Sequence, residues 1–353
     1  MGSIRTVSAA RELFHPAGVY LNTASAGLPP DTSWEQLQLE LARSRDGTAD
    51  IAGYDTYVEL ARSHFGRLVG TDVDRIAVGN QASVFFGMIA GSLPDGAEIL
   101  TAIGDFASVT FPFLAQHRFS VRAVQLEKIA DEITTSTTAV AVSAAQSSDG
   151  AVADLDSIAA ACAATGCLSL IDATQAYGWY PLRADDFDIT ITSGYKWLLA
   201  SRGTAFMTIR PALTDRILPV AAGWYAAADR WSDIYQSSMR LAAGARRFDI
   251  SPAWHSWVAA APALELLADI GSDALHRHAT GLADAFRAAV GLPAAGSAIV
   301  SVQLLPGAAD RVRRAGIVGA MRAGKLRLSF HLNNSGGDVT AAAEALSGHL
   351  MID

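Results

Sequence analysis

Short apolar runs rich in β-branched residues alternate with helical patterns between about residue 70 and residue 210. A helix that ends at Gly166 would be capped by Asp154 or Asp156. This alternation predicts an α/β fold with a large, doubly wound, mostly parallel sheet and helices on both of its faces. The expected strands are 75–78, 98–101, 120–126, 139–143, 168–171, 188–192 and 204–209, and the expected helices include 82–92 and 109–117.

The character of the chain changes after residue 225. Two helices rich in Ala and Leu, at 256–270 and 272–290, are followed by strands at 298–304 and 325–330. A last helix is expected at 339–349, with Asp338 as its cap. The pattern therefore predicts a large domain over residues 1–225 and a small C-terminal α+β domain over residues 226–353.

Composition narrows the range of partners. The 353 residues carry a net charge of -8 and have no run of five Lys or Arg, so a nucleic-acid partner is not expected. Neither a membrane span nor an apolar signal core near the start is expected, which favours a cytoplasmic protein. Cys162 and Cys167 are expected to be two buried thiols, and no residue set has metal-ligand spacing.

A carboxylate and a lysine follow two of the predicted strands. Asp172 comes directly after strand 168–171, and Lys196 comes four residues after strand 188–192. Ligands in open α/β sheets bind beyond the carboxyl ends of the strands, so the two groups are expected near each other. The pair suits pyridoxal phosphate (PLP), whose aldehyde forms a Schiff base with a lysine and whose ring nitrogen needs an acidic partner. An Asp–Lys ion pair at the sheet edge is the alternative interpretation.

A third segment suits the phosphate of such a cofactor. Strand 75–78 is followed by Gly79-Asn80-Gln81-Ala82-Ser83, which opens a helix. Backbone N–H groups at a helix start, together with the Ser83 hydroxyl, form an anion site. A plain turn with a serine near the helix cap is the alternative for this segment taken alone.

Four segments of the chain resemble the class V aminotransferase family of fold-type I PLP enzymes. This family includes cysteine desulfurases, C–S lyases, kynureninases and proteins like isopenicillin N epimerase. The resemblance covers nearly the whole chain and implies PLP as the cofactor, a homodimer and an amino-acid-like substrate. The segments that carry it are Tyr20 to Pro30, Asp172-Ala173-Thr174-Gln175, Ser193-Gly194-Tyr195-Lys196-Trp197 and Lys325 to Asn334.

The resemblance implies a role for each matching residue. Lys196 would form the internal aldimine and act as acid and base, and Asp172 would pair with the pyridine N–H. Gln175 would hydrogen-bond the phenolic oxygen of the cofactor. The other cofactor-binding residues that it implies are Gln81, Ala82, Ser83, Phe106, Gln146, Ser193 and Tyr195. The substrate-binding residues that it implies are Arg327, as the carboxylate-gripping arginine, with Asn22 and Ala24.

Two positions depart from common family patterns. Phe106 stands where many members have a histidine that stacks on the ring, and phenylalanine cannot move protons. The loop at 316–324 has no cysteine, so the persulfide chemistry of cysteine desulfurases is not expected. The resemblance implies an enzyme that acts at the substrate α-carbon through an external aldimine. We expect a β-eliminating, C–S type lyase, since no second carboxylate-binding arginine is evident; a class V aminotransferase or an epimerase of the isopenicillin N epimerase type is the alternative.

Overall fold

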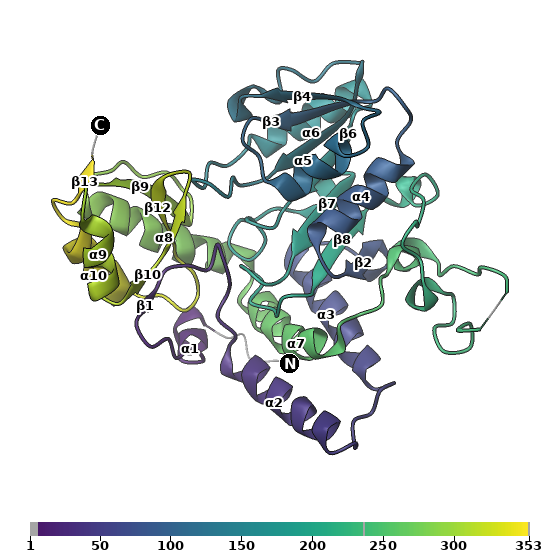
Figure 1. Cartoon of the computed structure of the whole chain (residues 1–353), viewed down its shortest axis with the longest axis horizontal. Helices are drawn as coiled ribbons and strands as arrows, with labels where there is room; N and C mark the ends of the chain where they lie inside the picture. Colours follow the sequence, from purple (N-terminus) through teal and green to yellow (C-terminus); the bar gives the residue numbers. More distant parts are fainter. Residues whose placement is uncertain (1–5, 236, 352–353) are drawn as a thin grey trace.

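Two main sheets organise the part of the chain that the computed structural model describes, residues 6–235 and 237–351 (Figure 1). The larger sheet has the strand order β2-β8-β7-β6-β5-β3-β4. Its neighbouring strands are parallel, except that β8 runs antiparallel to both β2 and β7. The expected α/β fold with a mostly parallel sheet is therefore confirmed. The strands are β2 (Ile76–Gly79), β3 (Glu98–Ala102), β4 (Ser120–Val124), β5 (Thr137–Ser143), β6 (Leu168–Asp172), β7 (Ile189–Ser193) and β8 (Ala205–Ile209).

Helices cover both faces of the larger sheet because its central strands are apolar on both sides. In β5, Val140 and Val142 join the core on one face, whereas Ala139 and Ala141 join the core on the other. The first core contains residues of α3 (Tyr54–Val69), α6 (Leu155–Thr165) and α7 (Trp254–Ile270). The second core contains residues of α4 (Ala82–Ser92) and α5 (Ala107–Leu114).

A smaller antiparallel sheet lies to one side of the larger one (Figure 1). It packs with three helices around a core of its own that includes Phe286, Leu328 and Leu346. In the described ranges, no helix has the length and apolar character that crossing a membrane requires. The sheet has the order β11-β12-β9-β13, from β9 (Ile299–Leu304), β11 (Ala320–Arg322), β12 (Lys325–Ser329) and β13 (Leu350–Met351), and its helices are α8 (Ser272–Ala289), α9 (Ala308–Arg314) and α10 (Gly336–Leu346).

The N-terminal segment contributes elements for which the sequence pattern made no prediction. They are α1 (Val7–Arg11), β1 (Val19–Tyr20) and α2 (Asp31–Arg45). Strand β1 pairs with β10 (Ile317–Val318), so the segment 316–324, expected to be a loop, instead forms β10 and β11.

One of the two expected helix caps agrees with the structure and the other does not. Asp154 caps α6 by accepting a hydrogen bond from the Ser157 N–H, and both cysteines are buried, as expected. The last helix begins three residues earlier than expected, because Ser335 is the cap and Asp338 is its reciprocal partner in a capping box. The domain boundary at residue 225 stays a prediction; α7, which follows it, packs against α2 and α3.

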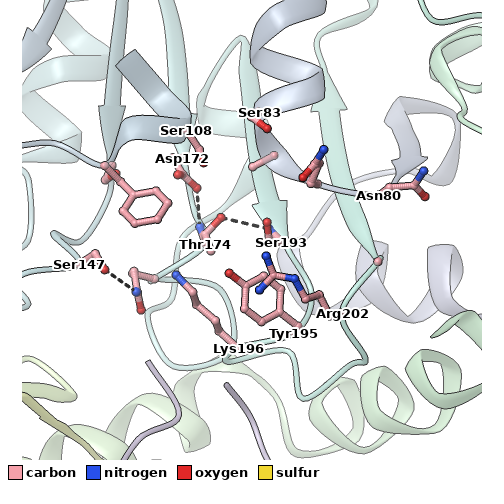
Figure 2. Close-up of a pocket in the computed structure, with 16 residues that line it drawn as sticks. Asn80, Ser83, Ser108, Ser147, Asp172, Thr174, Ser193, Tyr195, Lys196 and Arg202 are labelled. Atoms are coloured by element: carbon pink, nitrogen blue, oxygen red, sulfur yellow. Dashed lines mark hydrogen bonds between the residues drawn. The ribbon is translucent and has the colours of Figure 1, made fainter. Parts of the chain in front are cut away.

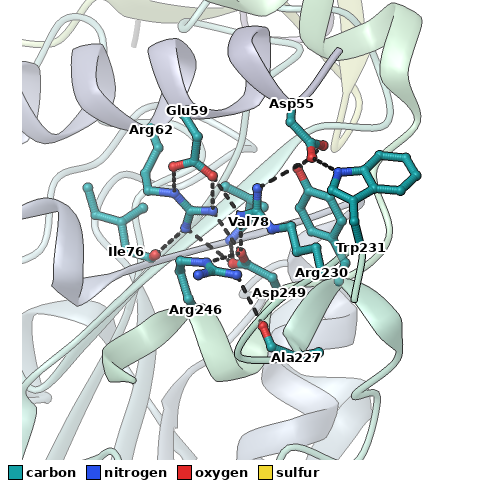
Figure 3. A network of polar contacts seen from close by, with 11 residues as sticks. Asp55, Glu59, Arg62, Ile76, Val78, Ala227, Arg230, Trp231, Arg246 and Asp249 are labelled. Carbon is teal, nitrogen blue, oxygen red and sulfur yellow. Dashed lines mark hydrogen bonds and ion pairs between the residues drawn. The ribbon is translucent and has the colours of Figure 1, made fainter. Parts of the chain in front are cut away.

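An ionic network lines the outer edge of β2, where the larger sheet has no further strand (Figure 3). The fully buried carboxylate of Asp249 lies 2.7 Å from the guanidinium of Arg62, which is 2% exposed. Asp249 also accepts a hydrogen bond of 2.9 Å from the Val78 N–H, and Arg62 donates to the Ile76 carbonyl. Side chains therefore satisfy edge groups of β2 that another strand would otherwise bind.

We expect Asp249→Ala to destabilise the protein by about 3–5 kcal/mol, because it leaves Arg62 buried without its main counter-ion. Urea denaturation followed by circular dichroism measures the change. The matched control is Asp215→Ala, which removes an exposed partner of Arg247 and should cost less than about 1 kcal/mol. Equal losses of stability in the two variants would contradict the importance of this network.

Candidate active site

A cavity of about 380 Å³ lies at the carboxyl ends of β2, β3, β5, β6 and β7 (Figure 2). This is the position at which open α/β sheets bind ligands, because the loops that follow parallel strands meet there. Polar side chains dominate its wall. The residues that line it are Asn80, Gln81, Ala82, Ser83, Phe106, Ser108, Ser143, Ser147, Asp172, Thr174, Gln175, Ser193, Tyr195, Lys196, Arg202 and Gly203.

Lys196 and Asp172 face the same cavity without touching each other. The side chains are 5% and 4% exposed, and the two groups form no ion pair within the described residues. Asp172 instead accepts a hydrogen bond of 2.8 Å from the Thr174 N–H. The amine and the carboxylate are thus held apart with open space available to a ligand between them (Figure 2).

Burial shifts both groups toward their neutral forms. It lowers the pKa of Lys196 to about 8, against the attraction of Asp172 and with the repulsion of Arg327, Arg322 and Arg202. Burial likewise raises the pKa of Asp172 to about 6, although its hydrogen bonds with Thr174 and the charge of Lys196 act in the opposite direction. At neutral pH the carboxylate is ionised, and the lysine gives up its proton far more readily than an exposed lysine does.

An aromatic ring borders the lysine. The Nζ atom of Lys196 lies 5.2 Å from the centroid of the Phe106 ring. Phe106 follows Asp105, whose carboxylate accepts hydrogen bonds from the N–H groups of Phe106 (2.6 Å) and Ser143 (2.8 Å). Burial raises the pKa of Asp105, which the sequence analysis did not single out. Asp105 therefore fixes the loop that carries the ring.

The N-terminus of α4 forms the opposite end of the cavity. Its cap residue, Gln81, makes no capping hydrogen bond through its side chain, so the first N–H groups of the helix are not satisfied in that way. The Ser83 hydroxyl and Arg202 line the same space, and Arg202 lies over the Tyr195 ring at 4.9 Å. Free helix N–H groups with a hydroxyl and a guanidinium nearby suit an anion such as a phosphate.

A hydrogen-bonded chain leads from the cavity wall to residues behind it. Gln175 donates to the Ser147 hydroxyl at 3.0 Å and to the Ala24 carbonyl at 3.0 Å, and it accepts from the Trp197 indole at 2.7 Å. Arg327, which is 2% exposed, donates to the Ser147 hydroxyl at 3.0 Å and to that of Ser25 at 2.7 Å. Ser147 thus joins Gln175 on the wall to an arginine behind it.

The loop that carries Lys196 is held by the opening segment of the chain and by His331. The Gly27 N–H donates to the Tyr195 carbonyl at 2.9 Å, and a Cβ atom at Gly27 would lie only 2.2 Å from the Lys196 carbonyl oxygen. Only glycine permits this approach. The buried ring of His331 contacts the Trp197 carbonyl at 2.9 Å, and burial lowers the pKa of His331 to about 3, so the ring is neutral.

The structure brings most of the residues singled out from the sequence to one cavity. Gln81, Ala82, Ser83, Phe106, Asp172, Gln175, Ser193, Tyr195 and Lys196 all line it. It does not place Gln146, Arg327, Asn22 or Ala24 on the wall: Arg327 and Ala24 lie behind it, and buried Gln146 lies beside Asp105.

Several lining residues had received no role from the sequence. Asn80, Ser143 and Thr174 follow or end strands, so the rule that found Asp172 could also have found them. Arg202 and Ser147 lie farther along their loops, beyond the reach of this rule, although Arg202 closely follows the lysine segment and belongs with it to the family resemblance. Among the described residues, no group of three or more His, Cys, Asp or Glu side chains is arranged to hold a metal ion.

Comparisons with known proteins match the chain to one family model and to several relatives. The family model "Aminotransferase class-V" matches residues 88–292. The uncharacterized aminotransferase YcbU of Bacillus subtilis is 29% identical over 239 residues, which are 62% of this chain and 61% of that protein. Isopenicillin N epimerase of Streptomyces clavuligerus is 24% identical over 305 residues, which are 78% of this chain and 75% of that protein. The match thus spans about three fifths of the Bacillus relative.

A solved structure of similar fold is the cystine C–S lyase C-DES in complex with its product, cysteine persulfide. Its TM-score is 0.84 with 17% identity, over 94% of this chain and 98% of that one. A lysine-to-alanine variant of C-DES has glycine linked covalently to its PLP cofactor. At this level of identity the likeness shows the shared fold.

The chain has only three lysines, Lys128, Lys196 and Lys325, which makes the buried amine easy to follow. We expect reductive methylation of the protein without cofactor to reach its half-maximal rate at Lys196 near pH 8, because burial disfavours the charged form. Peptide mass spectrometry after timed reaction with formaldehyde and a borane reductant measures the rate, with exposed Lys128 and Lys325 as internal references. A half-maximum near pH 10.4, the ordinary lysine value, would contradict the described environment.

Proposed function

Because the chain belongs to the class V aminotransferase family, it is a PLP-dependent enzyme, and we propose that it moves the α-proton of an amino-acid substrate with Lys196 as the base. The observation that carries this proposal is the placement of Lys196 and Asp172 on one cavity with space between them. When bound, PLP supplies an electron sink for the bond that breaks at the α-carbon.

The donor set of the cavity fits the cofactor at each of its functional groups. Lys196 would attach it covalently through Nζ, and the ionised Asp172 would face the ring nitrogen. The α4 N-terminus, Ser83 and Arg202 would hold the phosphate, with Ser193 and Tyr195 beside them. Phe106 would cover one face of the ring, and Gln175, which lines the same cavity, would contact the ring substituents.

Arg327 is proposed to bind the substrate carboxylate. Its guanidinium is buried, yet it has no carboxylate partner among residues 6–235 and 237–351 and contacts only the hydroxyls of Ser25 and Ser147 and the Ser147 carbonyl. A buried charge without a counter-ion is costly, so an anion supplied by the substrate would be bound well there. Arg327 and Lys196 would together orient the α-carbon with its proton toward Nζ.

The number of bases at the site distinguishes the candidate reactions. Lys196 and Asp172 both line the cavity with pKa values near neutral, about 8 and about 6. Because Asp172 would be occupied by the ring nitrogen and Phe106 cannot take part, Lys196 is left as the base. Epimerisation through two bases on opposite faces is therefore disfavoured. Transamination and β-elimination both need only one base at the α-carbon.

We place transamination first. In the sequence, the argument for elimination was that no second carboxylate-binding arginine is evident. The structure offers Arg322 as a candidate for that second arginine, because its side chain shares the Ser25 hydroxyl with Arg327. The name of the Bacillus subtilis relative also supports transamination. β-Elimination stays the second candidate because C-DES, which shares the fold, is a C–S lyase. The homodimer and the cytoplasmic location remain predictions.

Lys196→Ala should lose both covalent attachment of the cofactor and α-proton exchange. Borohydride reduction of the wild-type holoenzyme should place the pyridoxyl group on Lys196 among the three lysines, and exchange of the substrate α-proton in D₂O should fall by at least about a hundredfold in the variant. Lys128→Ala is the matched control and should keep both properties. A pyridoxyl group on Lys128 or Lys325 would refute the assignment.

Product analysis separates the two candidate reactions. We expect the holoenzyme, given a panel of amino acids and 2-oxo acids, to form a new amino acid without releasing ammonia, because transamination transfers the amino group to the second substrate. Coupled assays for ammonia and chromatography of the amino acids measure this. Stoichiometric release of pyruvate and ammonia from cysteine or cystine would show that elimination is the reaction instead.

A further inference from the structure

A second guanidinium group lies beside Arg327 on the hairpin formed by β11 and β12. Ala320 stands opposite Arg327 in the register of this hairpin, and Arg322 is two residues further along β11. Side chains alternate between the faces of a strand, so Arg322 and Arg327 project from the same face. Both donate to the Ser25 hydroxyl, Arg327 at 2.7 Å and Arg322 at 3.5 Å, so the two guanidinium groups meet at one oxygen atom.

These two arginines lack carboxylate partners of their own. In the described part of the chain, neither forms an ion pair, and Arg322 otherwise donates to its own strand at the Met321 carbonyl. Burial and then the charge of Arg322 lower the pKa of Arg327 to about 10. Two guanidinium groups that donate to the same hydroxyl repel each other, and this repulsion raises the free energy of the folded protein unless an anion binds between or beside them.

The balance of charge around the cavity is also positive. Four cations, Lys196, Arg202, Arg322 and Arg327, act on this site, because the three arginines all lower the pKa of Lys196. The carboxylates that act on it are Asp172 and Asp105. If Asp172 faces a protonated ring nitrogen and Arg202 a phosphate, one substrate carboxylate still leaves a guanidinium without an anionic partner.

We propose that Arg322 binds a second acidic group of the substrate while Arg327 binds the α-carboxylate, so that the enzyme selects amino acids with acidic side chains, such as aspartate or glutamate. This inference rests on the proposed role of Arg327. Arg327 is buried, whereas Arg322 is exposed, so the substrate enters with its α-carboxylate deep and its acidic side chain toward solvent. When the substrate side chain is neutral, Arg322 stays hydrated. The preference for an acidic over a neutral side chain is therefore only as large as the contribution of one partly exposed hydrogen bond between charged groups.

Equilibrium binding of simple carboxylates to the holoenzyme tests the inference without relying on turnover. Titration calorimetry compares succinate and glutarate with propionate and butyrate, which have one carboxylate each. We expect the dicarboxylates to bind about tenfold more tightly than the monocarboxylates. Arg322→Gln should abolish this preference without weakening propionate binding, and Arg322→Lys should restore part of it.

The matched control is Arg314→Gln, which removes the same charge from an exposed arginine at the end of α9 that lines no part of the cavity. This control should keep both the preference for dicarboxylates and the ratio of kcat/KM for glutamate over alanine. Arg322→Gln should lower that ratio about tenfold. Equal binding of the two classes by the wild type, or an unchanged preference in Arg322→Gln, overturns the inference while Arg327 keeps its proposed role. Failure of all four carboxylates to bind would overturn that role as well.

Discussion

The site depends on the placement of a buried amine and a buried carboxylate on one cavity without direct contact between them. A direct ion pair would satisfy both charges and leave nothing for a ligand to do. Here Asp172 is held instead by the Thr174 N–H, and Lys196 is left with a pKa of about 8 because burial disfavours its charge. The parallel strands β6 and β7 make this separation possible, because β6 ends at Asp172 and the loop after β7 carries Lys196, so both residues lie at the carboxyl end of the sheet on neighbouring strands.

The end of the cavity at the start of α4 has a separate source of rigidity. Strand β2 leads directly into the turn at Asn80 and Gln81, and β2 is an edge strand. The Arg62–Asp249 pair fixes the backbone of this strand at Ile76 and Val78, and the Ile250 N–H donates to the Val78 carbonyl. The segment around Asp249 therefore takes the place of a neighbouring strand and positions the start of α4 from outside the sheet.

Sequence predicted the parts of the molecule that follow local rules. The alternation of apolar runs predicted the larger sheet, and the residues at or shortly after its strand ends included Asp172 and Gln81, because the position of a strand end fixes the region of the side chains that follow. The same pattern made no prediction for α2, whose polar and apolar residues do not separate clearly into two faces, or for β1 and β10, which are only two residues long. Arg322 was missed for another reason: its proximity to Arg327 depends on the register of a short hairpin within a segment expected to be a loop.

The opening segment of the chain joins the smaller sheet to the loop of Lys196, so both sheets can contribute to the proposed substrate site. Its backbone pairs with β12 through the bridge between Asn22 and Ser329, and Ser25 accepts hydrogen bonds from Arg327. Within a few residues the same segment reaches the loop of Lys196 through the Gly27 N–H and accepts from Gln175 at the Ala24 carbonyl. A shift of the smaller sheet would therefore move Arg327 and the lysine loop together, because one extended stretch of backbone binds both. This coupling keeps the proposed carboxylate-binding arginines in register with the base, whereas two sheets joined only by a flexible linker would have no such constraint.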